Sequence, residues 1–177
     1  MASSRKKVIL RTTAHEVRPG YLPATGLLQS VDGQSAVTLL DLEGRIDLIS
    51  LAAVRWIAYV RDFNLTDKDD PERLSRRTFL ARPRTEGLWV RLTLTDGSIF
   101  EGLAPINLSL LDNTLDDNGI FLIPPDIRSN TQRLYIPRHQ IADMKMVAVV
   151  TTPSKPKSTE SEAVSQQAAL FPDSNRG

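Results

Sequence analysis

The side chains that most often carry catalysis are sparse in this sequence. Its 177 residues contain two histidines, His15 and His139, and no cysteine. A metal site needs about three protein ligands that converge on one point, and the positions of these histidines offer no such set. The chain also has no glycine-rich phosphate loop and no Gly-x-Ser-x-Gly nucleophile elbow. We therefore expect neither enzyme activity nor a bound cofactor or metal ion.

A dense group of arginines offers a different chemistry, the binding of anions. Between residues 73 and 91 there are six arginines and one glutamate. Arg73 and Arg77 have the spacing of the arginine pair with which PilZ domains bind a cyclic dinucleotide, and planar guanidinium groups suit phosphate oxygens. The compact segment with Asp or Asn, Ser and Gly that completes the PilZ motif is missing. The alternative is a solvated linker in which the acidic segment 62–72 balances the basic one.

The segment 124–133 is a second candidate for binding an anion or RNA. Two prolines open it, and Arg128, Asn130 and Arg133 would present several hydrogen-bond donors to a phosphate or a base. Sm-like proteins use their loops in this way. Because Ser, Asn and Asp are also ordinary turn formers, a turn with only a structural role is the alternative.

The C-terminal segment 151–177 is predicted to be disordered. It is rich in Thr, Pro, Ser, Lys, Glu and Gln, so it has little apolar surface to bury. Within it, Gln167, Leu170 and Phe171 resemble the short motif by which bacterial proteins bind the sliding clamp, although Ala168 stands where that motif usually has leucine. We expect a protein-binding motif here, with an incidental Leu-Phe pair, or one that folds back on the barrel, as the alternatives.

Charge and hydropathy limit the partners further. The chain has 22 Lys and Arg against 21 Asp and Glu, a net charge of +1, whereas a dedicated duplex-DNA binder needs a strong positive excess. No segment approaches the roughly 20 apolar residues that span a bilayer. The N-terminus has a basic start, but the apolar run 8–10 that follows is too short for a signal peptide. We expect a cytoplasmic protein with a protein partner, and RNA or a cyclic dinucleotide as the alternative ligand. The sequence leaves the oligomeric state open.

The elements that position these residues are predicted to be strands. Val90, Leu92 and Leu94 alternate with polar residues, and the dipeptide at 96–97, Asp-Gly, follows as a hairpin turn. Short strands separated by such turns are typical of sandwiches and small barrels. One short helix is predicted over residues 70–80, where Asp-Pro provides a cap and a first turn.

An internal repeat organises these strands. Residues 45–60 align without a gap with residues 132–147, an offset of 87. Six apolar positions match: Leu48 with Tyr135, Ile49 with Ile136, Val54 with Ile141, Ile57 with Met144, Tyr59 with Met146, and Val60 with Val147. Further back, Gly26 matches Gly102 at an offset of 76, which implies an insertion in the second unit.

We therefore expect a first barrel-like unit at 1–64, a linker at 65–87, a second barrel-like unit at 88–150 and the disordered tail at 151–177. Trp56 aligns with Asp143, which suggests a position on the outer face of its barrel. An exposed tryptophan usually covers something, either the packed surface between the two units or a protein partner.

The order of strands and turns resembles the SH3-like barrel, especially its Sm-like form. Residues 45–150 also resemble a bacterial family of uncharacterised domains, in the segments 53–63, 96–102 and 121–136. Domains of that family are often found beside PilZ and other signalling modules, and the resemblance implies no activity. The expectation is an all-β chain of two packed SH3/Sm-like units that acts as a non-catalytic binding, scaffolding or adaptor module. The alternative is an RNA- or nucleotide-binding sensor of Sm-like or PilZ-like type.

Overall fold

The regular structure of this chain is built from strands. The computed structural model describes residues 5–23, 26–63, 78–80, 83, 85–105, 119–125 and 130–151. Within these ranges the elements are strands and two short 3-10 turns, so the all-β prediction is confirmed. Most of the predicted helix at 70–80 and nearly all of the predicted tail lie outside the described residues.

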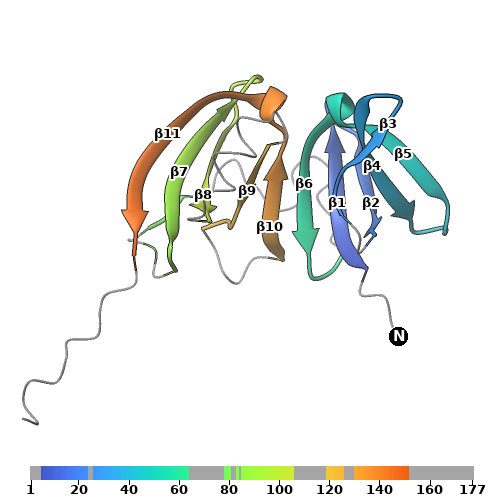
Figure 1. Ribbon diagram of the computed structural model, residues 1–177. Helices are drawn as coiled ribbons and strands as arrows, with labels where there is room; N and C mark the ends of the chain where they lie inside the picture. Colours follow the sequence, from blue (N-terminus) through green and yellow to red (C-terminus); the bar gives the residue numbers. More distant parts are fainter. Residues whose placement is uncertain are drawn as a thin grey trace, which may run out of the picture.

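Figure 1 shows the strands in two groups. The first group runs β1 (Lys6–Thr12), β2 (Val17–Leu22), β3 (Gln29–Val31), β4 (Gln34–Asp41), β5 (Ile46–Ser50), a 3-10 turn η1 (Leu51–Ala53) and β6 (Val54–Val60). The second runs β7 (Gly87–Leu94), β8 (Ile99–Ala104), β9 (Ile120–Leu122), β10 (Thr131–Ile136), a 3-10 turn η3 (Arg138–Gln140) and β11 (Ile141–Val150).

Both groups pair their strands in the same order. In the first, β1 pairs with β2, β2 with β4, β4 with β5, and β6 returns to the other edge of β1, all antiparallel. In the second, β7 pairs with β8, β8 reaches β9 through a single bridge, β9 pairs with β10, and β11 returns to β7. The strand orders are therefore β5-β4-β2-β1-β6 and β10-β9-β8-β7-β11, with β3 as an addition that pairs with the start of β4.

One antiparallel strand pair joins the two groups. β6, the last strand of the first group, pairs with β10 of the second, with Tyr59 opposite Arg133 and Ile57 opposite Tyr135. We call this pairing the junction. It makes β6 and β10 neighbours in the middle of the molecule and leaves β5 and β11 at opposite ends (Figure 1).

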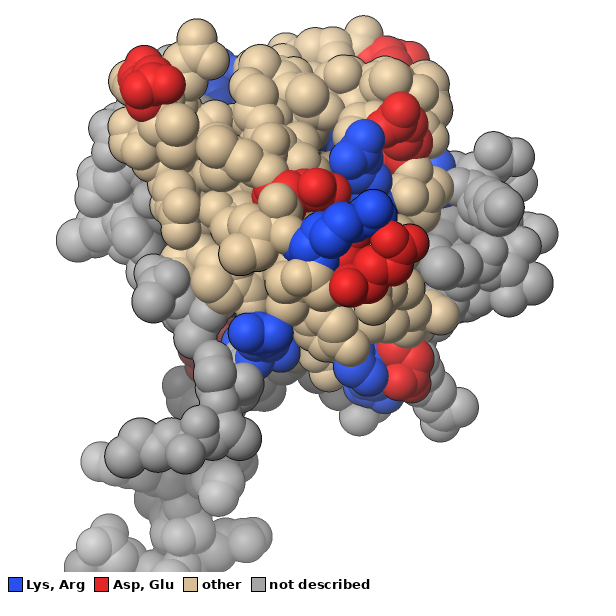
Figure 2. All heavy atoms as spheres, turned by 90° about the vertical axis from the view of Figure 1, so that its right-hand side faces the viewer, with Lys and Arg blue, Asp and Glu red and all other residues tan. Residues whose placement is uncertain are grey.

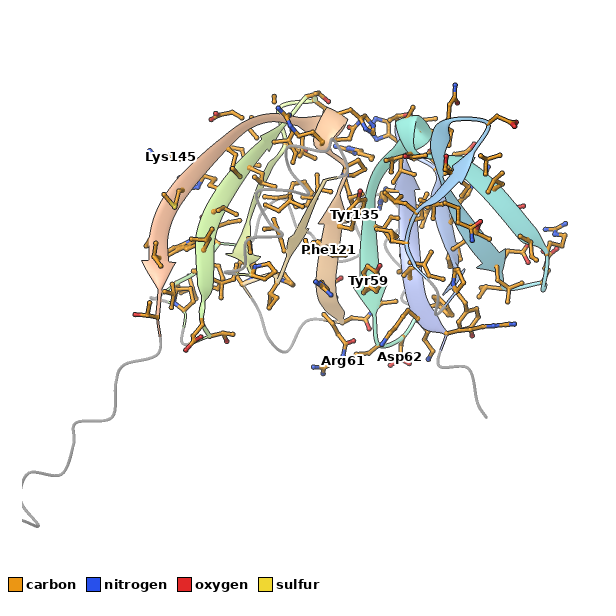
Figure 3. The ribbon with its side chains drawn as sticks, in the orientation of Figure 1. Tyr59, Arg61, Asp62, Phe121, Tyr135 and Lys145 are labelled. Carbon is orange, nitrogen blue, oxygen red and sulfur yellow. The ribbon has the colours of Figure 1, made fainter. Side chains whose placement is uncertain are left out.

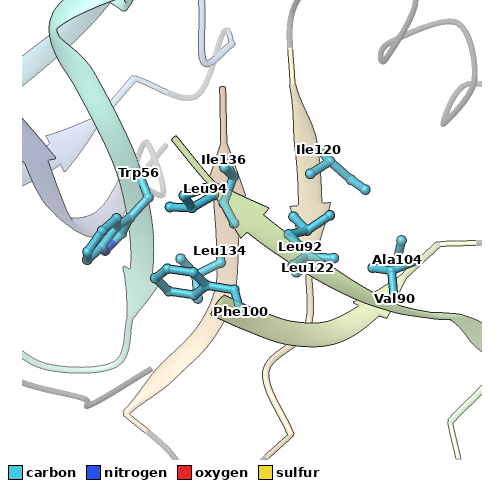
Figure 4. Packing of buried hydrophobic residues seen from close by; sticks show 10 residues of the cluster. All are labelled: Trp56, Val90, Leu92, Leu94, Phe100, Ala104, Ile120, Leu122, Leu134 and Ile136. Atoms are coloured by element: carbon cyan, nitrogen blue, oxygen red, sulfur yellow. The ribbon is translucent and has the colours of Figure 1, made fainter. Parts of the chain in front are cut away.

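The junction exchanges aromatic side chains between the two cores. Trp56 of β6 is buried among residues of the second group, where its ring packs against Phe100 with centroids 5.1 Å apart (Figure 4). In the other direction, Tyr135 of β10 is buried in the core of the first group. Burying a large aromatic ring contributes strongly to stability, so each core depends on a residue from the other group.

The local geometry of the two groups agrees in detail. The turn η1 at 51–53 and the turn η3 at 138–140 differ by the offset of 87 found in the sequence. The bulges agree as well, because Arg55 in β6 and Ala142 in β11 are the residues skipped where the register shifts.

A close backbone approach requires glycine at one matching position in each group. Gly20 lies opposite Val8, and Gly102 lies opposite Val90. A Cβ at Gly20 would lie 2.5 Å from the carbonyl oxygen of Leu40, and one at Gly102 would lie 2.8 Å from that of Ile123. The pairing therefore gives Gly102 the place of Gly20, whereas the sequence alignment matched it with Gly26, which lies outside the strands.

Candidate functional site

Most of the residues proposed from the sequence for ligand and tail binding lie outside the described part of the chain. These are Arg73, Arg77, Arg128, Gln167, Leu170 and Phe171. Asn130, Arg133 and Trp56 lie within the described part of the chain, and all three lie on or beside the paired strands of the junction.

Asn130 fastens the start of β10 to the end of β6. Its side-chain oxygen accepts a hydrogen bond of 2.9 Å from the backbone N–H of Asp62, and its amide nitrogen donates one of 2.7 Å to the Asp62 carbonyl. The Asn130 carbonyl also accepts a hydrogen bond from the backbone N–H of Arg61. The amide is thus engaged with backbone, as expected of the structural turn considered above.

Arg133 lies on a group of aromatic rings at the junction. Its guanidinium carbon is 4.0 Å from the centroid of the Phe121 ring, which in turn contacts Tyr135 and Tyr59 (Figure 3). Burial raises the pKa of both tyrosine hydroxyls above their ordinary value. The phenols therefore stay neutral near pH 7, and this aromatic group offers packing surface and one exposed cation rather than acid–base chemistry.

Trp56 is held between apolar and cationic neighbours. Its side chain is buried, and the guanidinium of Arg55 lies over its ring at 4.4 Å. Arg55 also forms an ion pair with Asp96, in the turn between β7 and β8 of the second group. These contacts add a polar connection to the junction. The Trp56 ring is buried there and is not exposed for binding a partner.

The largest exposed apolar side chains gather at the two ends of the molecule. Ten large apolar side chains are exposed among the described residues, and seven of them lie on β11 or on the hairpin that ends in β5. They are Leu42, Ile46, Leu48, Met144, Met146, Val147 and Val149. Within the described chain, β5 pairs only with β4 and β11 only with β7, so each strand has one edge without a partner. We call these two strands the free edges.

Figure 2 views the molecule from the side of the first free edge. Basic and acidic side chains lie next to one another in a band across this face, surrounded by uncharged residues. The ion pairs there include Arg18 with Glu16 and Asp47, and Arg45 with Asp41 and Glu43. Such paired charges leave no large field of one sign on this face.

A cavity of about 580 Å³ lies where the two 3-10 turns approach each other. Its lining residues are Gln34, Ser35, Ser50, Leu51, Ala52, Arg138 and His139. Arg138 donates a hydrogen bond of 3.2 Å to the Ile141 carbonyl and still reaches the cavity. The cavity thus combines hydroxyl, amide and cationic groups from both strand groups.

Comparison with models of known protein families identifies the family of this chain. The model of a family described as a family of unknown function (DUF6982) matches residues 4–148. The chain belongs to this family. No curated protein matches the chain. DUF6982 membership agrees with the expected resemblance to uncharacterised domains and covers both strand groups, but it assigns no activity.

One buried carboxylate in this DUF6982 chain was not singled out from the sequence. The Glu101 side chain is 1% exposed and accepts hydrogen bonds from the Phe79 backbone N–H at 2.9 Å, from Trp89 Nε1 at 3.0 Å and from the Arg91 guanidinium at 2.9 Å. Burial alone would raise its pKa, but the hydrogen bonds from Phe79, Arg91 and Trp89 and the Arg91 charge together lower it. A carboxylate with this many donors is a structural group. The signal for it was a lone acidic residue between Phe100 and Gly102 in a strand.

The described residues contain neither a candidate metal site nor a helix that could cross a membrane. No group of three or more His, Cys, Asp or Glu side chains there could hold a metal ion. No helix there is both long enough and apolar enough to cross a membrane.

Proposed function

We propose that this chain is a non-catalytic binding and scaffolding module, made of two SH3/Sm-like units in series, that engages other polypeptides through its free edges. The support for two such units is the shared strand order: apart from the added β3, four strands are followed by a 3-10 turn and a closing strand that returns to the first. The gap-free sequence repeat supports a common origin of the units.

The observation that carries this proposal is the exposed apolar surface on strands with an unpaired edge. A strand edge offers backbone N–H and C=O groups to a further strand, and proteins that do not use such an edge usually protect it with charge, proline or a bulge. On β11, Met144, Met146, Val147 and Val149 are all exposed, and only two residues of the strand, Asp143 and Lys145, are charged. The register shifts at Ala142 and Val147 lie on either side of the regular stretch 143–146 and leave that stretch unprotected. The combination is that of a binding surface.

Protein capture from lysate of the cells that produce this chain tests the proposal. Tagged baits are the full chain, a variant with Leu48→Lys and Met146→Lys, and a chain that ends at Val150. The matched control is Ile99→Lys, which places the same charge on an exposed apolar position away from both edges. We expect the bound proteins to be lost with the double variant and retained with the control.

Two other outcomes of this capture experiment would change the conclusion. Binding that survives in the double variant contradicts a role for the free edges. Loss of a protein only from the chain that ends at Val150 would instead assign that contact to the tail motif, Gln167 with Leu170 and Phe171, and a captured sliding clamp would identify its partner.

The alternative function, binding of RNA or a cyclic dinucleotide, is favoured by one observation, the cavity between η1 and η3. Arg138 and His139 are the cationic and hydrogen-bonding groups that an anionic ligand would meet there. Titration with a cyclic dinucleotide and with short single-stranded RNA tests it, comparing the full chain with Arg138→Ala and, as control, Arg45→Ala. Salt-sensitive binding that is lost only in Arg138→Ala would support this function.

A further inference from the structure

We propose that the free edge of β11 pairs with the free edge of β5 in a second copy of this chain, head to tail, and so repeats the junction between molecules. The inference rests on the proposed binding function of the free edges and names their partner. Its basis is that the chain already contains one example of the interface, between β6 and β10.

The two free edges are the counterparts of the two strands in the junction. β6 and β11 are the closing strands of their groups, and each pairs on one side with the first strand, β1 or β7. β10 and β5 are the strands before the 3-10 turn, and each pairs on one side with the strand preceding it, β9 or β4. The remaining edge of β6 meets the remaining edge of β10, whereas those of β11 and β5 are unpaired in the described chain.

The offset of 87 transfers the register of the junction to the free edges. In the junction, Ala58 lies opposite Leu134. Adding 87 to the first and subtracting 87 from the second places Lys145 of one copy opposite Asp47 of the next. Opposite charges at directly opposed positions stabilise an antiparallel pair, so the transferred register gives a favourable pair where the junction has an apolar one.

The neighbouring positions are complementary as well. The pair Ile57–Tyr135 becomes Met144 opposite Leu48, and Tyr59–Arg133 becomes Met146 opposite Ile46. Both transferred pairs bring apolar side chains together. A register displaced by one residue would instead place the charged residues opposite apolar ones, so the transferred register is selected by its chemistry.

The exposed fractions of the side chains differ between the junction and the free edges. In the junction, Ile57 is 0% exposed and Tyr135 is 2% exposed. Their counterparts Met144 and Leu48 are 45% and 53% exposed, and Met146 and Ile46 are 61% and 72% exposed. The positions of Ile57 and Tyr135 are thus covered in the middle of the molecule, whereas their counterparts Met144 and Leu48 are exposed at its ends. Met146 and Ile46 correspond to the half-buried Tyr59 and the exposed Arg133, so the contrast in burial rests on the central pair. A second copy of the chain carries the complementary edge.

The core exchange at the junction also has a counterpart. Trp56 packs on Phe100, which lies opposite Leu92 in β7; the matching position, opposite Leu10 in β1, is Arg18. Since Trp56 corresponds to Asp143, the transferred contact is between Asp143 of one copy and Arg18 of the next. Because Arg18 and Asp47 form an ion pair with each other within one copy, Asp143 and Lys145 of the neighbouring copy would extend that pair into a network of alternating charges, where the junction has two aromatic rings.

The positions of the edges determine the kind of assembly. β5 and β11 lie at opposite ends of the molecule, and Lys145 lies on the outermost strand (Figures 1 and 3). Two different surfaces that pair head to tail form a heterologous interface, which generates closed rings or open filaments rather than a two-fold dimer with a self-complementary face.

Sedimentation of the purified full chain over a concentration series tests this assembly. We expect the average mass to rise above that of a monomer with concentration. Lys145→Glu and Asp47→Lys each place like charges opposite one another and should raise the dissociation constant by about ten-fold or more. A chain that carries both substitutions restores opposite charges and should regain association. The control is Lys7→Glu, which reverses a charge in the exposed ion pair with Asp62, away from both edges, and should change nothing.

Three results would overturn the proposal: a monomer at all concentrations up to about 1 mM, association unaffected by either single substitution, or a double variant that fails to regain association. The restoring double variant guards against loss of folding in a single variant. If the chain is monomeric but edge substitutions still abolish protein capture, only the second copy is excluded as partner. If capture is also unchanged, the proposed function fails with it.

Discussion

At the scale of single residues, Glu101 shows how this fold accommodates a buried charge. Its carboxylate accepts hydrogen bonds from Phe79, Trp89 and Arg91, and Trp89 Nε1 has its acceptor there. We expect Glu101→Ala to lower the free energy of unfolding by about 2 kcal/mol, because buried donors lose their acceptor. Urea unfolding at pH 7 measures this, and a change below about 0.5 kcal/mol would contradict a structural role.

The same residue predicts a pH dependence of stability. The pKa of Glu101 is lower in the folded chain than the ordinary value, so the folded state favours the ionised form. Its contribution is fully present well above about pH 4.3, the unfolded value, and is lost as the pH falls through the lower folded-state pKa. The stability difference between the native chain and Glu101→Gln should therefore shrink as urea unfolding is repeated from pH 7 towards pH 3. A difference that stays constant would show that the carboxylate is not the group responsible.

Trp56 is the residue on which the second core depends most directly. Its ring belongs to the cluster that includes Phe100, Leu134 and Ile136, although it is carried by β6 of the first group (Figure 4). We expect Trp56→Ala to cost about 3 to 5 kcal/mol in the free energy of unfolding, as large-to-small changes of buried aromatic residues do. Truncation of the exposed Ile99 to alanine is the control, with an expected change within about 0.5 kcal/mol.

At the scale of elements, β2 and β8 share a requirement for glycine. A Cβ at Gly102 would meet the Ile123 carbonyl oxygen and Leu122, both on the neighbouring segment, and one at Gly20 would meet the Leu40 carbonyl oxygen. We expect Gly20→Ala and Gly102→Ala each to destabilise the fold by about 1 to 3 kcal/mol, because backbone must move. Gly97→Asn, at a turn with open space and a φ of +82°, should cost less, and thermal unfolding compares all three. A cost at only one of the two strand glycines would contradict their equivalence.

Elements also mark the limit of what the sequence could predict. The strand–turn–strand segments rest on local periodicity, and the offset of 87 relates the two 3-10 turns residue by residue. Whether a side chain is exposed also depends on which strand lies beside its own, and the local periodicity of the sequence does not reveal that neighbour. Leu48 and Tyr135 align as apolar residues, yet one is exposed at a free edge and the other is buried at the junction. Likewise, the role of Asn130 depends on Asp62, 68 residues earlier, which no local pattern connects to it.

At the scale of the whole molecule, the junction makes the two strand groups interdependent. Trp56 completes the second core, Tyr135 lies in the first, and β6 and β10 share backbone hydrogen bonds. A fragment of either group alone would expose an aromatic-sized gap and an unpaired strand edge. Two units that resemble separate barrels in sequence are therefore expected to behave as one folding unit.

This interdependence predicts a single unfolding transition for the chain. The measurement uses two variants on a Lys145→Glu background, so that association of copies does not couple to folding: Trp89→Phe leaves Trp56 as the fluorescent probe, and Trp56→Phe leaves Trp89. In each variant, the urea midpoint from tryptophan fluorescence should coincide with the midpoint from far-UV circular dichroism, which follows the strands of both groups. Midpoints that separate within one variant would show that the groups unfold independently, and the exchange of Trp56 and Tyr135 would then be contact without cooperativity. Coincident midpoints would mean that the same strand pairing which we propose between copies already acts within one copy as the link that makes two cores one.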